Sequence, residues 1–104
     1  MPLLAVDLRT DYLPGTDFGH AEVIVARAEA GQRRYTQYFL HTASSGTDYS
    51  ASARIAEFAQ VDDDHPYSLV VKLLDSRGRT VDFRVLRVDV RDRDLVVTSL
   101  IARS

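Results

Sequence analysis

The sequence contains no cysteine, no tryptophan and no asparagine among its 104 residues. The lack of cysteine excludes a disulfide framework, a thiolate metal site and a nucleophilic thiol. The lack of asparagine excludes N-glycosylation. Lysine is also almost absent, because twelve of the thirteen basic residues are arginine and Lys72 is the single lysine.

The chain also lacks an excess of positive charge and a long apolar run. Its formal net charge is −2, so it has no overall basic field to hold nucleic acid, and we expect no nucleic-acid partner. No apolar run approaches the roughly 18 residues of a transmembrane helix. The first residues include Asp7 and Arg9 but no basic segment, unlike a signal peptide. We expect a soluble chain, extracytoplasmic if it is a domain excised from a surface protein.

The length and the apolar content, 45% of residues, fit a single domain over residues 1–104. Apolar and polar residues alternate in short runs that are separated by turn residues. The alternation predicts seven strands, at about residues 3–9, 20–30, 33–42, 53–61, 67–74, 81–90 and 95–102. Residues 53–61 could instead form one or two helical turns. This pattern predicts an all-β fold, an antiparallel β-sandwich; the alternatives are a prealbumin-like sandwich and a small up-and-down barrel.

The clearest element is a β-hairpin that starts at Tyr67. Asp75 suits the first position of a type I turn, and Gly78 suits the left-handed residue that closes it. If Asp75 pairs with Arg79, apolar residues face each other along both arms, and the one lysine faces an aspartate. The resulting pairs are Leu73–Val81, Val71–Phe83, Leu69–Val85 and Lys72–Asp82. This register predicts that the odd-numbered apolar residues of both arms face the core.

Two further predictions concern the end of this hairpin and the start of the chain. The apolar positions change from odd to even numbers after Val85, which predicts a β-bulge near Val85–Leu86. The polar turn at residues 91–94 predicts a second hairpin, in which Val90 pairs with Leu95. Near the start of the chain, an apolar group in the loop after the first strand is expected to cover one end of the core. This group consists of Tyr12, Leu13 and Phe18.

The approach to the hairpin resembles the tyrosine corner of immunoglobulin-like and fibronectin type III-like domains. Val61 is followed six residues later by Tyr67, and then by alternating apolar residues. The resemblance implies that the Tyr67 hydroxyl bonds backbone in the loop that crosses between the sheets. It also implies that residues 67–74 are the penultimate strand of the standard set. Residues 95–102 are then an addition, or the assignment of strands to the standard set is shifted by one. The opening VDLRTDYLPGTDF is similar to small sandwich modules repeated in bacterial surface proteins and lipoproteins.

The densest group of candidate metal ligands consists of Asp62, Asp63 and Asp64. Ca²⁺ prefers six to eight oxygen ligands, so these carboxylates indicate a possible calcium or small-ligand site. The alternative is a solvated acidic loop. The three histidines do not show the spacing of a metal site.

Aromatic and arginine side chains supply the candidate binding residues. Arg33, Tyr35 and Tyr38 could form a patch that stacks on a nucleotide or a sugar, or a solvated face with arginine stems over tyrosine rings. The loops at residues 10–19 and 42–50 are a second candidate surface, because loops often carry binding groups. The candidate binding residues are therefore Tyr12, Arg33, Tyr35, Tyr38 and Tyr49.

The chain has no G-x-S-x-G motif, no glycine-rich phosphate loop and no carboxylate pair with catalytic spacing. We therefore expect that it is not an enzyme and needs no cofactor. The main hypothesis is a non-catalytic binding or spacer module of a bacterial surface or multidomain protein, with a protein or a neighbouring domain as partner. The alternatives are a calcium-binding or small-ligand-binding domain and a structural subunit that self-associates through an edge such as residues 50–58.

Overall fold

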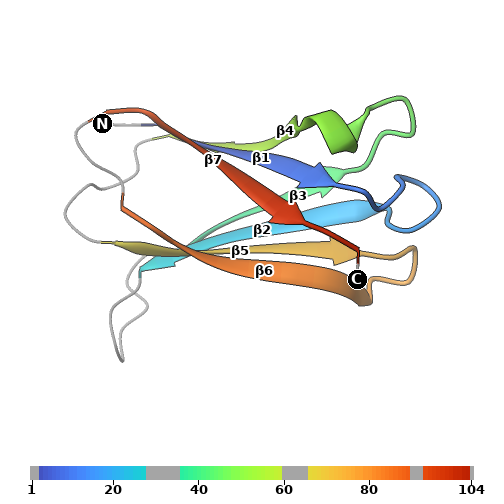
Figure 1. Cartoon of the computed structure of the whole chain (residues 1–104). Helices are drawn as coiled ribbons and strands as arrows, with labels where there is room; N and C mark the ends of the chain where they lie inside the picture. The colour runs from blue at the N-terminus through green and yellow to red at the C-terminus, as the bar shows by residue number, and fades with distance from the viewer. Residues whose placement is uncertain (1–2, 28–35, 60–65, 90–92, 104) are drawn as a thin grey trace.

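The computed structural model of the chain describes residues 3–27, 36–59, 66–89 and 93–103. Seven strands form two sheets that pack face to face, and one turn of 3-10 helix (η1) lies between the third and fourth strands (Figure 1). The elements are β1 (Leu4–Thr10), β2 (His20–Arg27), β3 (Thr36–Thr42), η1 (Tyr49–Ala51), β4 (Ala53–Phe58), β5 (Tyr67–Leu74), β6 (Thr80–Val88) and β7 (Leu95–Ile101). The prediction of a seven-strand, sandwich-like all-β fold is confirmed, and the described strands do not close into a barrel.

One sheet has the order β4-β1-β7 and the other has the order β3-β2-β5-β6. All neighbouring strands are antiparallel except β1 and β7, which are parallel. The expectation of a wholly antiparallel sandwich was therefore wrong for this pair. The predicted hairpin between residues 81–90 and 95–102 was also wrong, because β7 pairs with β1 in the other sheet; Val90 itself lies outside the described residues. Beside β1, the apolar strand β7 covers the core from the second layer, and Ile101 is fully buried.

The core lies between the central strands of the two sheets. On β5, every second side chain is fully buried, from Tyr67 to Leu73. The same alternation buries Ala21, Val23 and Val25 on the neighbouring strand β2. Strand β1 supplies the opposite layer with the buried side chains Leu4, Val6 and Leu8. Burial on this scale is the main source of stability, at about 25 cal/mol per Å² of apolar surface.

The turn of the β5–β6 hairpin forms as predicted. The Asp75 N–H donates to the carbonyl of Arg79 at 2.9 Å, and the Gly78 N–H donates to the carbonyl of Asp75 at 3.0 Å. Gly78 has a φ of +79°, a left-handed conformation that favours glycine. The Asp75 carboxylate also accepts from the backbone N–H of Arg77 and of Arg79, each at 2.9 Å.

The predicted register of this hairpin was wrong by one residue. Leu74 pairs with Thr80, but Leu73 pairs with Asp82, so Val81 is the extra residue of a β-bulge beside the turn. The bulge was predicted near Val85–Leu86, on the same strand but further from the turn. Because side chains alternate between faces, one inserted residue reverses the face of all those that follow.

The bulge turns the predicted core residues of β6 to the outside. Phe83 is 51% exposed and Val85 is 57% exposed, whereas Val88 is buried and Leu86 packs partly against the core. Lys72 consequently lies opposite Phe83 and not opposite Asp82.

The remaining predictions had mixed outcomes. Phe18 is buried and covers the core as expected, Tyr12 is partly buried against it, and Leu13 is exposed, contrary to the prediction. The strand expected from Ala53 is confirmed as β4, whereas the helical alternative is not. In the described part of the chain, no helix is long and apolar enough to cross a membrane.

Candidate functional site

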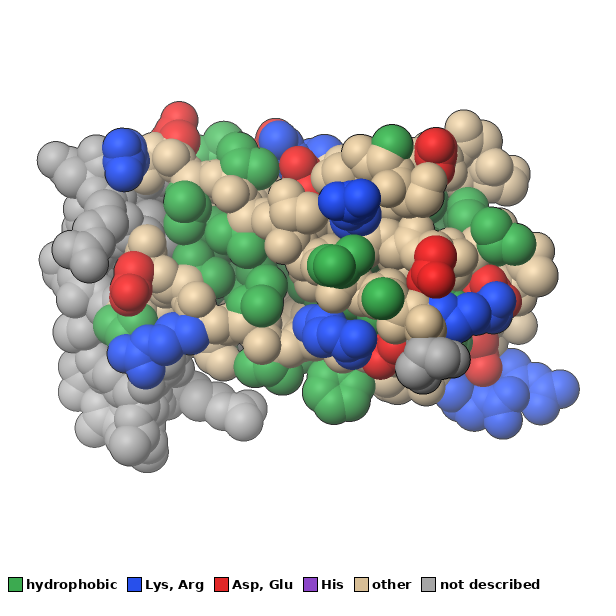
Figure 2. Space-filling view, viewed as in Figure 1, with side chains coloured by type: hydrophobic (Ala, Val, Ile, Leu, Met, Phe, Trp, Pro, Cys, Tyr) green, Lys and Arg blue, Asp and Glu red, His purple; other side chains and the backbone are tan. Residues whose placement is uncertain are grey.

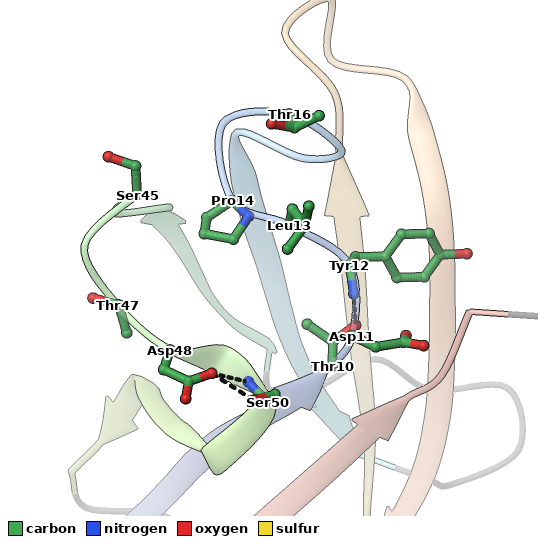
Figure 3. Close-up of a pocket in the computed structure, with 10 residues that line it drawn as sticks. All are labelled: Thr10, Asp11, Tyr12, Leu13, Pro14, Thr16, Ser45, Thr47, Asp48 and Ser50. Atoms are coloured by element: carbon green, nitrogen blue, oxygen red, sulfur yellow. Dashed lines mark hydrogen bonds between the residues drawn. The ribbon is translucent and has the colours of Figure 1, made fainter.

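Two loops that the sequence singled out meet at one end of the sandwich. The β1–β2 loop and the segment between β3 and η1 line an open cavity of about 340 Å³ (Figure 3). The lining residues are Thr10, Asp11, Tyr12, Leu13, Pro14, Thr16, Ser45, Thr47, Asp48 and Ser50. The volume is at the lower end of the range for small-ligand pockets.

The β1–β2 loop is a compact turn with its own hydrogen bonds. Gly15 has a φ of +83°, and its N–H donates to the carbonyl of Phe18 at 2.8 Å. The Asp17 carboxylate accepts from the Leu13 N–H at 2.7 Å, and the Asp17 N–H donates to the Leu13 carbonyl at 2.8 Å. The turn at Pro14–Gly15 therefore sets the shape of this rim.

The polar groups of the cavity mainly hold the loops in place. The Thr10 hydroxyl donates to the carbonyl of Ile101 at 2.5 Å and accepts from the Tyr12 N–H at 3.1 Å. The Asp48 carboxylate accepts from the N–H and the hydroxyl of Ser50, and these bonds lower its pKa (Figure 3). Polar groups that are engaged in this way offer little to a ligand.

Tyr12 extends from this loop away from the cavity, toward the edge strand β6 (Figure 3). Its hydroxyl donates to the Asp82 carboxylate at 3.1 Å, and the Arg103 guanidinium lies 5.1 Å from the centre of its ring. Partial desolvation and the nearby Asp82 raise the pKa of the Tyr12 hydroxyl. Arg103 also forms an ion pair with Asp17 at 2.8 Å. Tyr12 thus connects the loop to β6.

Tyr49, the other candidate from the loops, lies in the core. Its ring packs edge-on against Phe18, with 5.5 Å between the ring centres. Its hydroxyl accepts from the Ser44 N–H at 3.1 Å and lies 2.9 Å from Nε2 of His41. Burial lowers the pKa of His41, and the nearby His20 lowers it further. Tyr49 therefore fastens η1 to the core from within.

The outward face of the β3-β2-β5-β6 sheet is a different kind of surface, rich in apolar side chains. One row across the four strands consists of Tyr38, Ile24, Val70 and Val85, and the next consists of Leu40, Glu22, Lys72 and Phe83. The members from the two edge strands are exposed. In Figure 2, hydrophobic side chains reach the surface along the lower edge of the molecule, where β6 runs in Figure 1.

A polar group occupies the centre of this face. The Tyr38 hydroxyl donates to the Glu22 carboxylate at 3.2 Å, and the Lys72 ammonium lies 3.9 Å from the other oxygen of the same carboxylate. Desolvation and the Glu22 charge raise the pKa of Tyr38. The face therefore combines apolar side chains with this paired charge group, and the exposed Arg87 lies next to Val85 in the neighbouring row.

Of the candidate residues from the sequence, the structure brings Tyr38 to this exposed face. Arg33, Tyr35 and the acidic group Asp62, Asp63 and Asp64 lie outside the described residues, so those hypotheses stay predictions. Among the residues that the structure does describe, no group of three or more His, Asp or Glu side chains could hold a metal ion.

Sequence reasoning missed Leu40, Phe83 and Val85 as surface residues. Their alternation was visible, but it fits burial on either face of a sheet. Whether a strand is central or at the edge of its sheet would have distinguished buried from exposed apolar residues. Both edge strands of the wider sheet carry exposed apolar side chains.

No model of a known protein family matches the chain, and no curated protein and no solved structure matches it significantly. The chain's own geometry is therefore the basis for any assignment.

Proposed function

We propose that the chain is a non-catalytic protein-binding module and that the outward face of the β3-β2-β5-β6 sheet is its binding surface. The observation that supports this proposal is one apolar row across all four strands and, beside it, a row with apolar residues on both edge strands, where the side chains of both rows are exposed. Single exposed apolar residues are normal on proteins. Contiguous apolar patches are typical of surfaces that bind other proteins.

The chemistry of the face favours a folded protein or a neighbouring domain as partner. Phe83 and Val85 supply apolar area, and aromatic residues are enriched at the centres of protein interfaces. On the described part of this face Lys72 is paired with Glu22, and the exposed Arg87 is one further cation, too few charges to hold a phosphate backbone. The loop end is the weaker candidate, because the side chains of Thr10 and Asp48 in its lining are already engaged in hydrogen bonds within the protein.

We also propose that the module is of the immunoglobulin-like or fibronectin type III-like kind. Tyr67 is fully buried at the start of β5, just after the chain passes from β4 in one sheet to β5 in the other. The tyrosine corner of such folds occupies the same place. Strand β7, parallel to β1, is then the strand added to the standard set.

A photoreactive phenylalanine analogue at position 83 tests the binding surface. The matched control carries the analogue at Glu57, an exposed position on the outward side of β4. In cells that express the full protein, we expect irradiation to give one major adduct with another protein or domain at position 83 and none at position 57. Equal labelling at both positions, or no adduct at position 83, would contradict the proposal.

A further inference from the structure

The edges of the four-stranded sheet differ in how well they are protected against pairing with another chain. In the strand order β3-β2-β5-β6, β3 and β6 are the two edge strands. The facing sheet has one strand fewer. Strand β6 carries Asp82, Arg84 and Arg87 and a bulge, features that discourage pairing. Strand β3, with the sequence TQYFLHT, has no acidic residue, no lysine and no arginine.

Three consecutive apolar residues of β3 are exposed. Phe39 lies opposite Val23, which is fully buried, so the Phe39 ring is on the inner side of its sheet. It is nevertheless 45% exposed, because the narrower sheet does not fully cover this edge. Tyr38 and Leu40 are exposed on the outer side. The edge therefore presents apolar surface on both of its faces.

The backbone bonds between β2 and β3 show which groups of β3 are free to pair. The Ala43 N–H donates to the carbonyl of Gly19 at 2.9 Å, in register with the β2–β3 ladder. Backbone groups alternate in direction along an antiparallel strand, so those of Phe39 also face β2. The N–H and C=O groups of Tyr38 and Leu40 then face away from β2, toward the open edge.

We propose that β3 pairs antiparallel with β3 of a second copy of this chain, about a two-fold axis at Phe39. In this register, Tyr38 of one copy exchanges two hydrogen bonds with Leu40 of the other. The two Phe39 rings meet on the inner side, and Gln37 faces His41 beside them. Apolar residues meet apolar residues on both faces, and no charge is opposed.

The register is what favours a second copy over another partner strand. It is self-complementary, and a two-fold contact of this kind closes after two chains. One strand from each copy forms a small interface, below the roughly 1,200 Å² that stable complexes bury, so we expect a reversible dimer. The inference goes beyond the proposed function, since it leaves Phe83 and Val85 free and joins the outward faces of two copies into one.

Sedimentation with two charged variants tests the axis. We expect the wild-type mass to rise toward that of a dimer as the concentration rises to about 1 mM, the range of weak complexes. Phe39→Lys and Phe39→Glu should each stay monomeric, because the axis opposes like charges. An equimolar mixture of the two variants should dimerise again, because it opposes unlike charges. Circular dichroism should show both variants folded, since Phe39 is partly exposed.

The control is Leu100→Lys, at an exposed apolar residue of the other sheet, and it should dimerise like the wild type. A wild type that is monomeric at the highest concentration would overturn the inference. So would dimers of either Phe39 variant alone, or a mixture that stays monomeric. If Phe83→Lys abolishes the dimer and Phe39→Lys does not, the copies associate through the outward face, and pairing through β3 is wrong.

Cysteine cross-linking gives an independent measure of the register, because the chain has no cysteine of its own. Phe39→Cys places two thiols opposite each other, at a Cα separation of about 4.5–5.5 Å that allows a disulfide. Leu40→Cys is the matched control, because its Cα atoms would be about 8 Å apart across the axis. Faster oxidation to a dimer at position 39 supports the register, and equal rates contradict it.

Discussion

Strands β5 and β6 are the two arms of one hairpin and show the same apolar alternation, yet they use it in opposite ways. On β5 the alternating apolar side chains, from Tyr67 to Leu73, are fully buried. On β6 those of Val81, Phe83 and Val85 face the solvent. Alternation thus shows that a strand has one apolar side. The position of the strand in its sheet decides whether that side is buried in the core.

The difference follows from what lies across the sandwich from each arm. Strand β5 is central, with β2 and β6 on either side and the second sheet above it. Strand β6 is an edge, and the inner side of its first half carries Asp82 and Arg84, which form an ion pair at 3.1 Å. Asp82 also accepts the hydrogen bond from Tyr12. A polar cluster therefore covers the inner side of β6 near the turn, where apolar residues were predicted.

The largest expected effect is the loss of a buried side chain from β5. Leu73→Ala should destabilise the fold by about 2–5 kcal/mol, because it removes buried methyl groups and leaves a cavity. Phe83→Ala on β6 should cost less than about 1 kcal/mol, as at most surface positions. Urea unfolding of both variants measures the difference. Equal losses would restore the register predicted from the sequence, in which both residues face the core.

Deletion of Val81 tests the cause of the difference. Without this residue, Asp82 can follow Thr80 directly and still pair with Leu73, so the faces of β6 should stay as they are. We expect a folded chain that is less stable by about 1–2 kcal/mol, the usual range for a single change. If solvent exposure of Phe83, measured by NMR, falls sharply in the variant, the pairing of Asp82 with Leu73 does not decide which side of β6 faces the core.

Much of the fold could be predicted from the sequence because local chemistry determines it. Asp75 and Gly78 specify their turn without help from the rest of the chain. The bulge could not be placed, since the apolar pattern permits it anywhere between the turn and Leu86, and contacts with the other sheet make the choice. The parallel pairing of β1 with β7 also depends on tertiary contacts. The apolar pattern of β7 fits a place beside β6 as well as the observed place beside β1.

The candidate site was less predictable for the same reason. Tyr38 was named for its aromatic ring and is exposed, whereas Tyr49 was named for its polar loop and is buried. Composition does not show whether a loop packs against the core. Tyr49 of η1 does so because its ring packs against Phe18 and its hydroxyl lies beside His41.

A smaller effect is expected in the other layer of the core. Ser99 on β7 is fully buried, and its hydroxyl has no hydrogen-bond partner among the described residues. Ser99→Ala should stabilise the protein by about 1 kcal/mol, because burying an unpaired hydroxyl is unfavourable. Thr98→Ala, at the exposed neighbour, is the control and should change stability much less. Thermal unfolding that shows no gain for Ser99→Ala would mean that the hydroxyl is solvated.

The smallest expected effect concerns β3, the other edge strand, and depends on pH. Burial holds the pKa of His41 below its value of about 6.5 in unfolded chains. Between the two pKa values the unfolded state binds more protons, so stability is lost as pH falls from 7 toward the folded pKa. In the protonated ring both nitrogens are donors, so Nε2 can then only donate toward the Tyr49 hydroxyl. Urea unfolding between about pH 5 and 7, above the range in which carboxylates titrate, should show this slope in the wild type and a weaker one in His41→Gln. If the slope of stability against pH is the same in His41→Gln, another titrating group causes it. The inner side of β3 would then contribute little to core stability, as on β6.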